Sequence, residues 1–138
     1  MTQEKLSQFI RRNRIRMNSE LTDTNPQMAS DADWMRSATH WKVTLRCRRR
    51  QLSTYFSQGP AIAKEPTAED VLDCLASDAA SVETAGSFEE WARELGFDTD
   101  SRKAEKTYAV CERQAGKLRD LINDPQEYDK LLYHTERL

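Results

Sequence analysis

The sequence predicts a single α+β domain over residues 1–138, with an N-terminal helix, a small three-stranded antiparallel sheet, and then about four helices packed on one face. Apolar and polar residues alternate in the first part of the chain, which is the period of a half-buried strand. After Gly59-Pro60 the apolar spacing changes to the three and four of helices, and capping residues precede each run. A chain of 138 residues with 11 aromatic residues can build one core without disulfides or metals.

The first elements are a helix and an edge of the sheet. Leu6, Phe9 and Ile10 stand at helical spacing and predict a helix over residues 3–13. Residues 15–21 then read as a strand with one face facing the core and the other facing water. The core-facing residues are Ile15, Met17, Ser19 and Leu21, and the others are Arg16, Asn18 and Glu20. Residues 22–38 are rich in turn formers, and Pro26 ends regular structure there.

The strongest strand signal lies in residues 41–57. Trp41, Val43, Leu45 and Cys47 alternate with Lys42, Thr44, Arg46 and Arg48, and residues 52–57 alternate in the same way. The two runs are close enough to form an antiparallel hairpin. Its turn is expected near Arg48–Gln51, although it lacks the usual Asn-Gly or Gly.

Two capped helices follow the sheet. Thr67 is the expected N-cap of the first, with Asp70 in its first turn. Its expected inner stripe is Val71, Leu72, Leu75, Ala76 and Ala79. Ser87 and Glu90 form a capping box for the second helix, which ends at Gly96. The residues expected to face inward from it are Phe88, Trp91, Ala92 and Leu95.

The last two helices carry the most regular pattern. The longer one starts near Ser101, and apolar residues then recur at steps of four and three. This seam consists of Ala104, Tyr108, Cys111, Ala115, Leu118 and Ile122. The final helix has Asp124 as N-cap, Pro125 at its first position and Glu127 in its first turn. Its expected core residues are Tyr128, Leu131 and Leu132.

Charge divides the chain into a basic helix-plus-sheet part (1–58) and an acidic helical part (59–138). The first carries 11 Lys/Arg and 5 Asp/Glu, a balance of +6, and the second 10 and 18, a balance of −8. Such polarity can steer charged partners. The chain has no apolar run long enough for a membrane span and no signal-peptide pattern. We therefore expect a soluble cytoplasmic protein that does not contact membranes.

The sequence contains few residues that could act in catalysis or bind a metal, and their spacing does not suit either role. His40 and Cys47 stand seven residues apart on one strand, about 23 Å when extended, so they cannot exchange a proton. The three cysteines, Cys47, Cys74 and Cys111, are expected to be buried packing residues. Asp98-Thr99-Asp100-Ser101 resembles the start of a calcium loop, but Lys103 and Ala109 stand where that loop needs Gly and Glu. The sequence therefore predicts no catalytic residues, no metal and no cofactor.

Two charged surfaces remain as candidate partner-binding sites. The basic one lies on the solvent face of the sheet and its turn: Arg16, Lys42, Arg46, Arg48, Arg49, Arg50 and Tyr55. It could bind nucleic-acid phosphates or an acidic protein, or it could be an ordinary solvated sheet face. The acidic one lies on the helix after Thr67: Glu69, Asp70, Asp73 and Asp78. It could mimic DNA toward a nucleic-acid-binding enzyme, or be an ordinary solvated helix face.

Several motifs resemble a family of small, mostly uncharacterised proteins of bacteriophages and prophages. They are Phe9-Ile10, Ile15-Arg16-Met17, Asn25-Pro26-x-Met28, Trp41, Tyr55-Phe56-Ser57-x-Gly59, the helix motif of residues 66–79, Phe88-Glu89-x-Trp91 and residues 98–105. The resemblance covers nearly the whole chain. The sequence departs from the family after Gly59, where Pro60-Ala61-Ile62-Ala63-Lys64 replaces a short loop rich in Gly and His.

The resemblance implies an accessory phage protein that is expressed in the host cytoplasm. Small phage proteins without catalytic motifs often bind a host or defence protein stoichiometrically, as anti-CRISPR proteins do. By that analogy, the chain is expected to be a non-enzymatic inhibitor of a bacterial host or defence protein. The alternative is a nucleic-acid-binding accessory protein that uses the basic sheet face.

Overall fold

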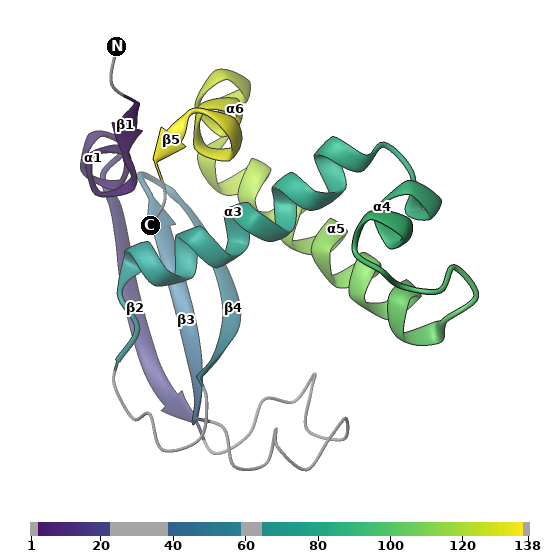
Figure 1. Cartoon of the computed structure of the whole chain (residues 1–138). Coiled ribbons are helices and arrows are strands. Elements are labelled where there is room, and N and C mark those ends of the chain that lie inside the picture. Colours follow the sequence, from purple (N-terminus) through teal and green to yellow (C-terminus); the bar gives the residue numbers. More distant parts are fainter. Residues whose placement is uncertain (1–2, 23–38, 59–64, 137–138) are drawn as a thin grey trace.

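The computed structural model of the chain describes residues 3–22, 39–58 and 65–136 (Figure 1). Its elements, in chain order, are β1 (Glu4–Lys5), α1 (Leu6–Arg12), β2 (Ile15–Thr22), β3 (Thr39–Cys47), β4 (Arg50–Gln58), α3 (Ala68–Ala85), α4 (Phe88–Glu94), α5 (Arg102–Ile122), α6 (Pro125–Tyr133) and β5 (Thr135–Glu136). The α+β class, the five helices and the three-stranded antiparallel sheet are confirmed. The expected connection over residues 23–38 lies outside the described residues. Across the described parts, no helix combines the length and apolar character that a membrane crossing needs.

The main sheet has the order β2-β3-β4, with both pairings antiparallel. Ile15 pairs with Cys47 on one side of β3, and Leu45 pairs with Leu52 on the other. Cys47 also pairs with Arg50, so the hairpin turn consists of Arg48 and Arg49, inside the expected region. This register places Val43, Leu45, Cys47 and Leu52 on the buried face, because side chains alternate along each strand.

The N-terminal helix is shorter than the sequence predicts. It begins at Leu6 rather than residue 3, because Glu4 and Lys5 form β1 and pair in parallel with Thr135 and Glu136 of β5. The backbone N–H of Lys5 donates to Gln8 Oε1 at 3.0 Å, which fixes the start of the helix. A two-residue strand whose partner lies at the other end of the chain has no periodic pattern that reveals it.

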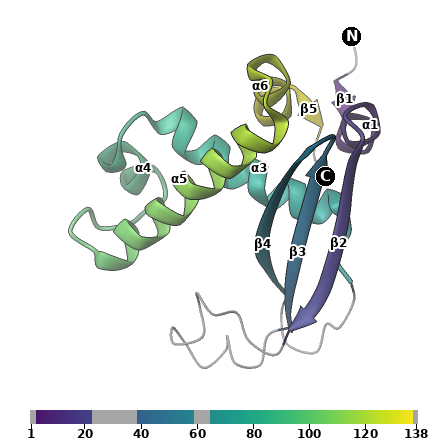
Figure 2. The same ribbon diagram turned by 180° about the vertical axis from the view of Figure 1, so that it is seen from behind.

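No described helix covers the second face of the sheet, in agreement with helices packed on one face, but the helices contact the sheet unequally. Figures 1 and 2 show α3 crossing one face, while α5 lies beside β4 and continues the layer of the sheet. The remaining two, α4 and α6, pack chiefly on α3 and α5. The opposite face of the sheet has no described helix over it (Figure 2).

Apolar side chains form two clusters. The larger one joins α1, the sheet, α3, α5 and α6, and its fully buried members include Phe9, Leu45 and Leu118. The smaller one lies among the end of α3, α4 and the start of α5, around Trp91. The Trp91 ring stacks on Phe97 with centroids 5.5 Å apart, and its indole N–H donates to Ser81 Oγ at 3.1 Å.

The helix seams and most caps are confirmed. Thr67 and Asp70 exchange both bonds of a capping box, Ser87 Oγ accepts from Glu90 N, and Ser101 caps α5. Three side chains differ from the prediction. Leu21, expected on the core face of its strand, is 58% exposed near the end of β2. Leu95 is 54% exposed because it is the C-cap of α4 and leaves the inward stripe. Cys74 is exposed because it lies one position outside the buried stripe of α3.

Candidate functional site

The uncovered face of the sheet is a polar surface made of three cross-strand rows. The strand pairings place side chains from β2, β3 and β4 next to one another in each row. The rows are Arg16–Arg46–Gln51, Asn18–Thr44–Ser53 and Glu20–Lys42–Tyr55. All of them are exposed except Thr44 and Tyr55, which are half-buried. The structure therefore places Arg16, Lys42, Arg46 and Tyr55 on one face, as the alternation predicts.

Arginines concentrate at the α1 end of this face. Arg16 and Arg46 are direct cross-strand neighbours, and like charges in such a pair repel each other. Because Ile15 pairs with Cys47, the residues just beyond that pair, Arg14 and Arg48, lie at the same end of the sheet. We call Arg14, Arg16, Arg46, Arg48 and Arg49 the arginine cluster. All five are exposed, and none takes part in the ion pairs of the described residues.

Two members of the cluster occupy backbone positions that favour glycine. Arg14 has φ 56° and directly follows the C-cap of α1, where a left-handed residue commonly ends a helix. Arg48 has φ 59° and is the first residue of the two-residue hairpin turn. A side chain in this region of φ is strained relative to glycine. Arginine therefore stands at two positions where the backbone conformation favours glycine.

The backbone beneath the cluster is held by a buried asparagine. Asn13 is only 5% exposed, and its Nδ2 donates to Phe9 O at 3.1 Å and to Glu127 Oε1 at 3.0 Å. Its own carbonyl accepts from Cys47 Sγ at 3.4 Å. Asn13 thus joins α1, β3 and α6 directly below the arginines. Sequence reasoning missed it, because nothing in the local pattern marks it as buried.

Two neighbouring arginines have internal partners: Arg12, which lies outside the predicted face, and Arg50, which belongs to it. Arg12 donates from Nε and Nη2 to the two carboxylate oxygens of Glu4, both at 2.8 Å, and also contacts Glu127. Arg50 donates from Nη1 to Asp120 O at 3.4 Å and, with the Asn123 amide turned so that its oxygen faces Arg50, also donates to that oxygen. Arg50 therefore ties the hairpin to the end of α5, and the structure gives it an internal partner.

A basic stripe on α5 extends the surface, and sequence reasoning missed it. Ala104, Cys111, Ala115 and Leu118 are buried, and three basic residues recur about half a turn away from them around the helix. These residues are Lys106, Arg113 and Lys117, which we call the α5 stripe. Lys117 Nζ donates to Ser53 O at 3.0 Å, which places the stripe directly beside β4. The signal was available as the spacing of seven and four opposite the apolar seam.

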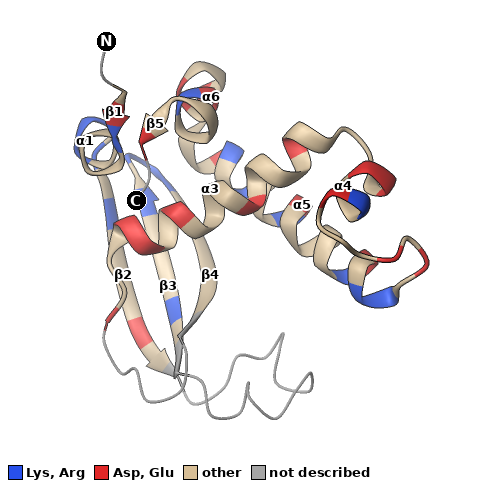
Figure 3. Ribbon diagram, viewed as in Figure 1, with Lys and Arg blue, Asp and Glu red and all other residues tan. Residues whose placement is uncertain are grey.

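The predicted acidic residues do not form a comparable free surface. The Asp70 carboxylate accepts from Thr67 N at 3.0 Å as part of the helix cap. Glu69, Asp73 and Asp78 are half-buried, and desolvation raises the pKa of Asp78. Figure 3 shows the red segments distributed along α3 and α4 and around the turn before α5. Blue segments gather at the α1 end of the sheet (Figure 3).

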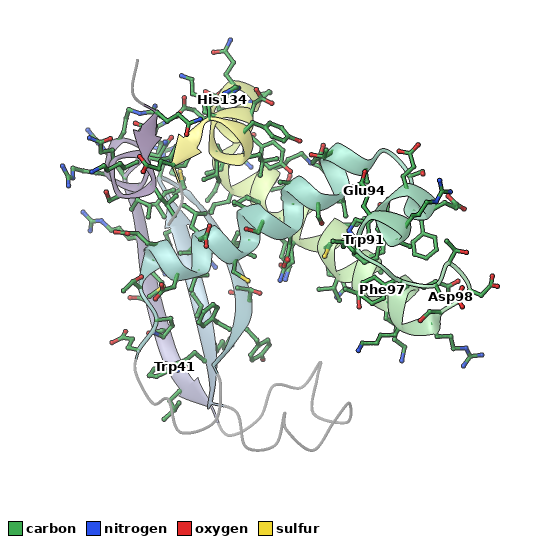
Figure 4. The ribbon with its side chains drawn as sticks, viewed as in Figure 1. Trp41, Trp91, Glu94, Phe97, Asp98 and His134 are labelled. Atoms are coloured by element: carbon green, nitrogen blue, oxygen red, sulfur yellow. The ribbon has the colours of Figure 1, made fainter. Side chains whose placement is uncertain are left out.

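Groups that could perform catalysis remain scattered in the described residues. His134 Nε2 lies 3.7 Å from Asp129 Oδ2, but both side chains are more than half exposed on the outside of α6 (Figure 4). Desolvation raises the pKa of Cys74 and of Cys111 to about 11, so both thiols stay protonated near neutral pH. No group of three or more His, Cys, Asp or Glu side chains suited to a metal occurs in the part of the chain that the structure describes.

Two surface hollows also lack a catalytic arrangement. One lies beside α1 and is lined by Lys5, Gln8 and Arg11, together with the paired Arg12 and Glu4. The other lies between α3 and α5, where Glu83 already accepts from Arg119 at 2.6 Å and from the Tyr128 hydroxyl at 3.4 Å. Neither brings a nucleophile together with a base. Figure 4 shows Trp91, Glu94, Phe97 and Asp98 at the α4 end, where Trp91 is buried.

Comparison with protein families, with curated proteins and with solved structures finds no match for this chain. The resemblance to phage proteins therefore stays a prediction. The uncovered basic face, formed by the arginine cluster, the sheet rows and the α5 stripe, is the candidate functional site.

Proposed function

We propose that the chain is a non-enzymatic accessory protein that binds nucleic acid through its basic sheet face. The observation that carries the proposal is the arginine cluster: five exposed arginines at one end of an uncovered sheet, outside the described ion pairs. Mutual repulsion in such a cluster is relieved when phosphates neutralise it. The strained positions of Arg14 and Arg48 support the same conclusion, since a structural turn would be better served by glycine.

The composition of the face favours nucleic acid over a protein partner. Protein interfaces of standard size usually have an apolar, aromatic-rich centre. The three rows of this face offer only Tyr55 as an aromatic residue, and that side chain is half-buried. Its other members are arginine, lysine, asparagine, glutamine, serine, threonine and glutamate, which are the side chains that contact phosphates and base edges.

Binding of labelled DNA and RNA at several salt concentrations tests the proposal. The affinity should fall steeply as salt rises, with a slope of about 0.9 in log K per phosphate contact for duplex DNA. The double variant Arg16→Gln/Arg46→Gln should weaken binding of every sequence and reduce the slope. Arg93→Gln, an exposed arginine on α4 far from the sheet, is the matched control and should leave binding unchanged. Absence of binding at low salt would reject the proposal.

A second candidate is stoichiometric inhibition of a bacterial host or defence protein. One observation favours it: Leu95 is 54% exposed beside the acidic residues of α4, and nucleic-acid binding leaves such a side chain without a role. The test is a pull-down from host lysate, followed by titration of any partner for one-to-one stoichiometry. Charge reversal at Arg46 and Arg48, or at Glu69 and Asp73, then identifies the surface that is used. Failure to recover a stoichiometric partner would count against inhibition and leave nucleic-acid binding untouched.

A further inference from the structure

We infer that the nucleic acid is duplex DNA, with the β2–β3 ribbon in the major groove and the α5 stripe on the phosphates of one strand. The inference rests on the proposed function and adds the class of ligand and its orientation. Four features of the described residues support it: the aromatic residues, the width of the sheet, the chemistry of its rows and the position of α5.

The aromatic residues argue against a single-stranded ligand. Proteins that bind single strands stack successive bases on exposed aromatic rings. Four of the described aromatic residues pack together in the α4 cluster, where Trp91 is 1% exposed and contacts Phe88, Phe97 and Tyr108, and Trp41 and Phe56 of the sheet pack against the main core. The open face keeps only Tyr55 near its rows. A ligand of this face is therefore bound through phosphates and base edges that are already presented by a duplex.

The width of the sheet selects the groove. The sheet has three strands in the order β2-β3-β4, so β2 is an edge strand. Neighbouring strands lie about 4.8 Å apart, and this edge strand with β3 has the width of a two-stranded ribbon, which fits a major groove about 12 Å wide. A minor groove about 6 Å wide is too narrow for it. The major groove of A-form RNA is deep and narrow and excludes such a ribbon as well. B-form DNA is the duplex that can accept β2 and β3 with their side chains directed inward.

The side chains of the ribbon match the base edges of a major groove. Asn18 and Thr44 are cross-strand neighbours at its centre, and both can donate and accept hydrogen bonds. Arg16 and Arg46 stand at one end, where bidentate contacts to guanine or to phosphate are available. Glu20 stands at the other end beside Lys42, and a carboxylate there suits the amino group of cytosine better than a phosphate.

The position of α5 supplies the contact to the backbone. Helix α5 lies beside β4, at the edge of the open face, where Lys117 Nζ donates to Ser53 O. Lys106, Arg113 and Lys117 extend over about 16 Å of helix, and successive base pairs are stacked about 3.4 Å apart. The stripe can therefore contact several successive phosphates of one DNA strand, at the edge of the groove that holds β2 and β3.

The experiment compares one DNA duplex, its separate strands and an RNA duplex of the same sequence, using the whole chain. We expect the DNA duplex to bind at least tenfold more tightly than the other two. Methyl green, which occupies the major groove, should displace the protein, and netropsin, which occupies the minor groove, should not. Displacement by netropsin alone, or stronger binding of a single strand or of RNA, would overturn the inference while leaving nucleic-acid binding in place. Failure of all ligands to bind would reject both.

Two variants separate the roles of ribbon and stripe. Arg113→Gln should lower the slope of log K against log salt by about 0.9 and weaken all DNA sequences equally. Asn18→Ala/Thr44→Ala should leave that slope unchanged but reduce the preference among duplex sequences. Arg113→Gln avoids Lys117, whose bond to Ser53 O also supports the edge of the sheet. Thermal unfolding of each variant identifies a loss of fold, and an unchanged slope in a folded Arg113→Gln protein contradicts the placement of α5.

Discussion

The sheet end and the α4 end of the molecule use their side chains in opposite ways. At the α4 end, the last turns of α3, α4 and the first turns of α5 close around Trp91, and the aromatic rings pack on one another. At the sheet end, only one face is covered, and the other presents charged and polar rows to solvent. The comparison teaches that the α4 end closes around packed aromatic rings, while the sheet end leaves a charged face exposed and its arginines available for binding.

Loss of the aromatic centre should have the largest effect. Trp91→Ala removes a side chain that is 1% exposed and the bond from its indole N–H to Ser81. We expect a loss of about 3–5 kcal/mol in the free energy of unfolding, measured by urea denaturation. Leu95→Ala, on the same helix but exposed, should change it by less than about 0.5 kcal/mol. A small loss for Trp91→Ala would mean that the α4 end contributes little to the fold.

Removal of the buried asparagine should be the largest polar effect at the sheet end. Asn13→Ala removes one hydrogen bond to Phe9 O within the end of α1 and one to Glu127 Oε1 that joins α1 to α6. We expect a loss of about 1–3 kcal/mol in the free energy of unfolding. Nucleic-acid affinity should also fall, because the backbone that carries Arg14 loses its support. Measurement of both quantities in one variant decides whether Asn13 positions the cluster; a stability loss with unchanged affinity would limit Asn13 to a packing role.

The N-cap residues of α3 and α4 allow the same substitution to be compared at the two ends of the molecule. Thr67 begins α3 over the sheet, and Thr67 and Asp70 exchange both bonds of the capping box. Ser87 begins α4 and accepts a single bond, from Glu90 N. Thr67→Ala and Ser87→Ala should each cost about 1 kcal/mol, because each removes the side-chain oxygen that accepts one backbone bond; the bond from the backbone N–H of residue 67 to Asp70 survives the substitution. Clearly unequal losses would show that one of the two side chains stabilises more than its own helix start.

The smallest expected effect is a pH dependence that arises at the sheet end. Desolvation acts to raise the pKa of Glu127, but hydrogen bonds from Asn13, Lys130 and Arg12 outweigh it and lower the pKa below its ordinary value of 4.5. A carboxyl with a lowered pKa in the folded state stabilises the fold above its unfolded pKa. That stability is lost as the pH falls below about 4.5 and through the folded pKa.

Glu127→Gln should therefore reduce the decline of unfolding free energy between neutral and acidic pH. The difference is expected to be below about 1 kcal/mol, since Arg12 and Lys130 are both about half exposed. Asp129→Asn on the same helix, whose only described partner is the exposed His134, is the control. Identical pH profiles for the wild type and Glu127→Gln would show that Glu127 does not contribute to the pH dependence of the free energy of unfolding.

Local sequence patterns predicted most of the fold. The alternation in β3 placed Lys42, Thr44 and Arg46 on one side because a period of two is specific to strands. The caps at Thr67, Ser101 and Asp124 set the helix starts within a residue or two. Features that depend on distant partners could not be found in this way. The pairing of β1 with β5 and the burial of Asn13 require knowledge of which segments meet in space.

The candidate site was predicted in part for the same reason. Arg16, Lys42 and Arg46 follow from strand alternation alone, and the structure adds that Arg16 and Arg46 are neighbours. The different roles of Arg12 and Arg50 depend on Glu4, Asp120 and Asn123, which alternation cannot reveal. The α5 stripe was visible as spacing, but its relation to the sheet depends on the packing of α5 against β4.

The left-handed backbone at Arg14 and Arg48 implies a trade-off that engineering can expose. Glycine at either position would relieve the strain of a positive φ, so Arg14→Gly and Arg48→Gly should each make the fold more stable by about 1 kcal/mol. The same substitutions would remove two of the five charges with which the surface attracts phosphates. A more stable version of this protein can therefore be designed at these two positions, and it should be a poorer binder.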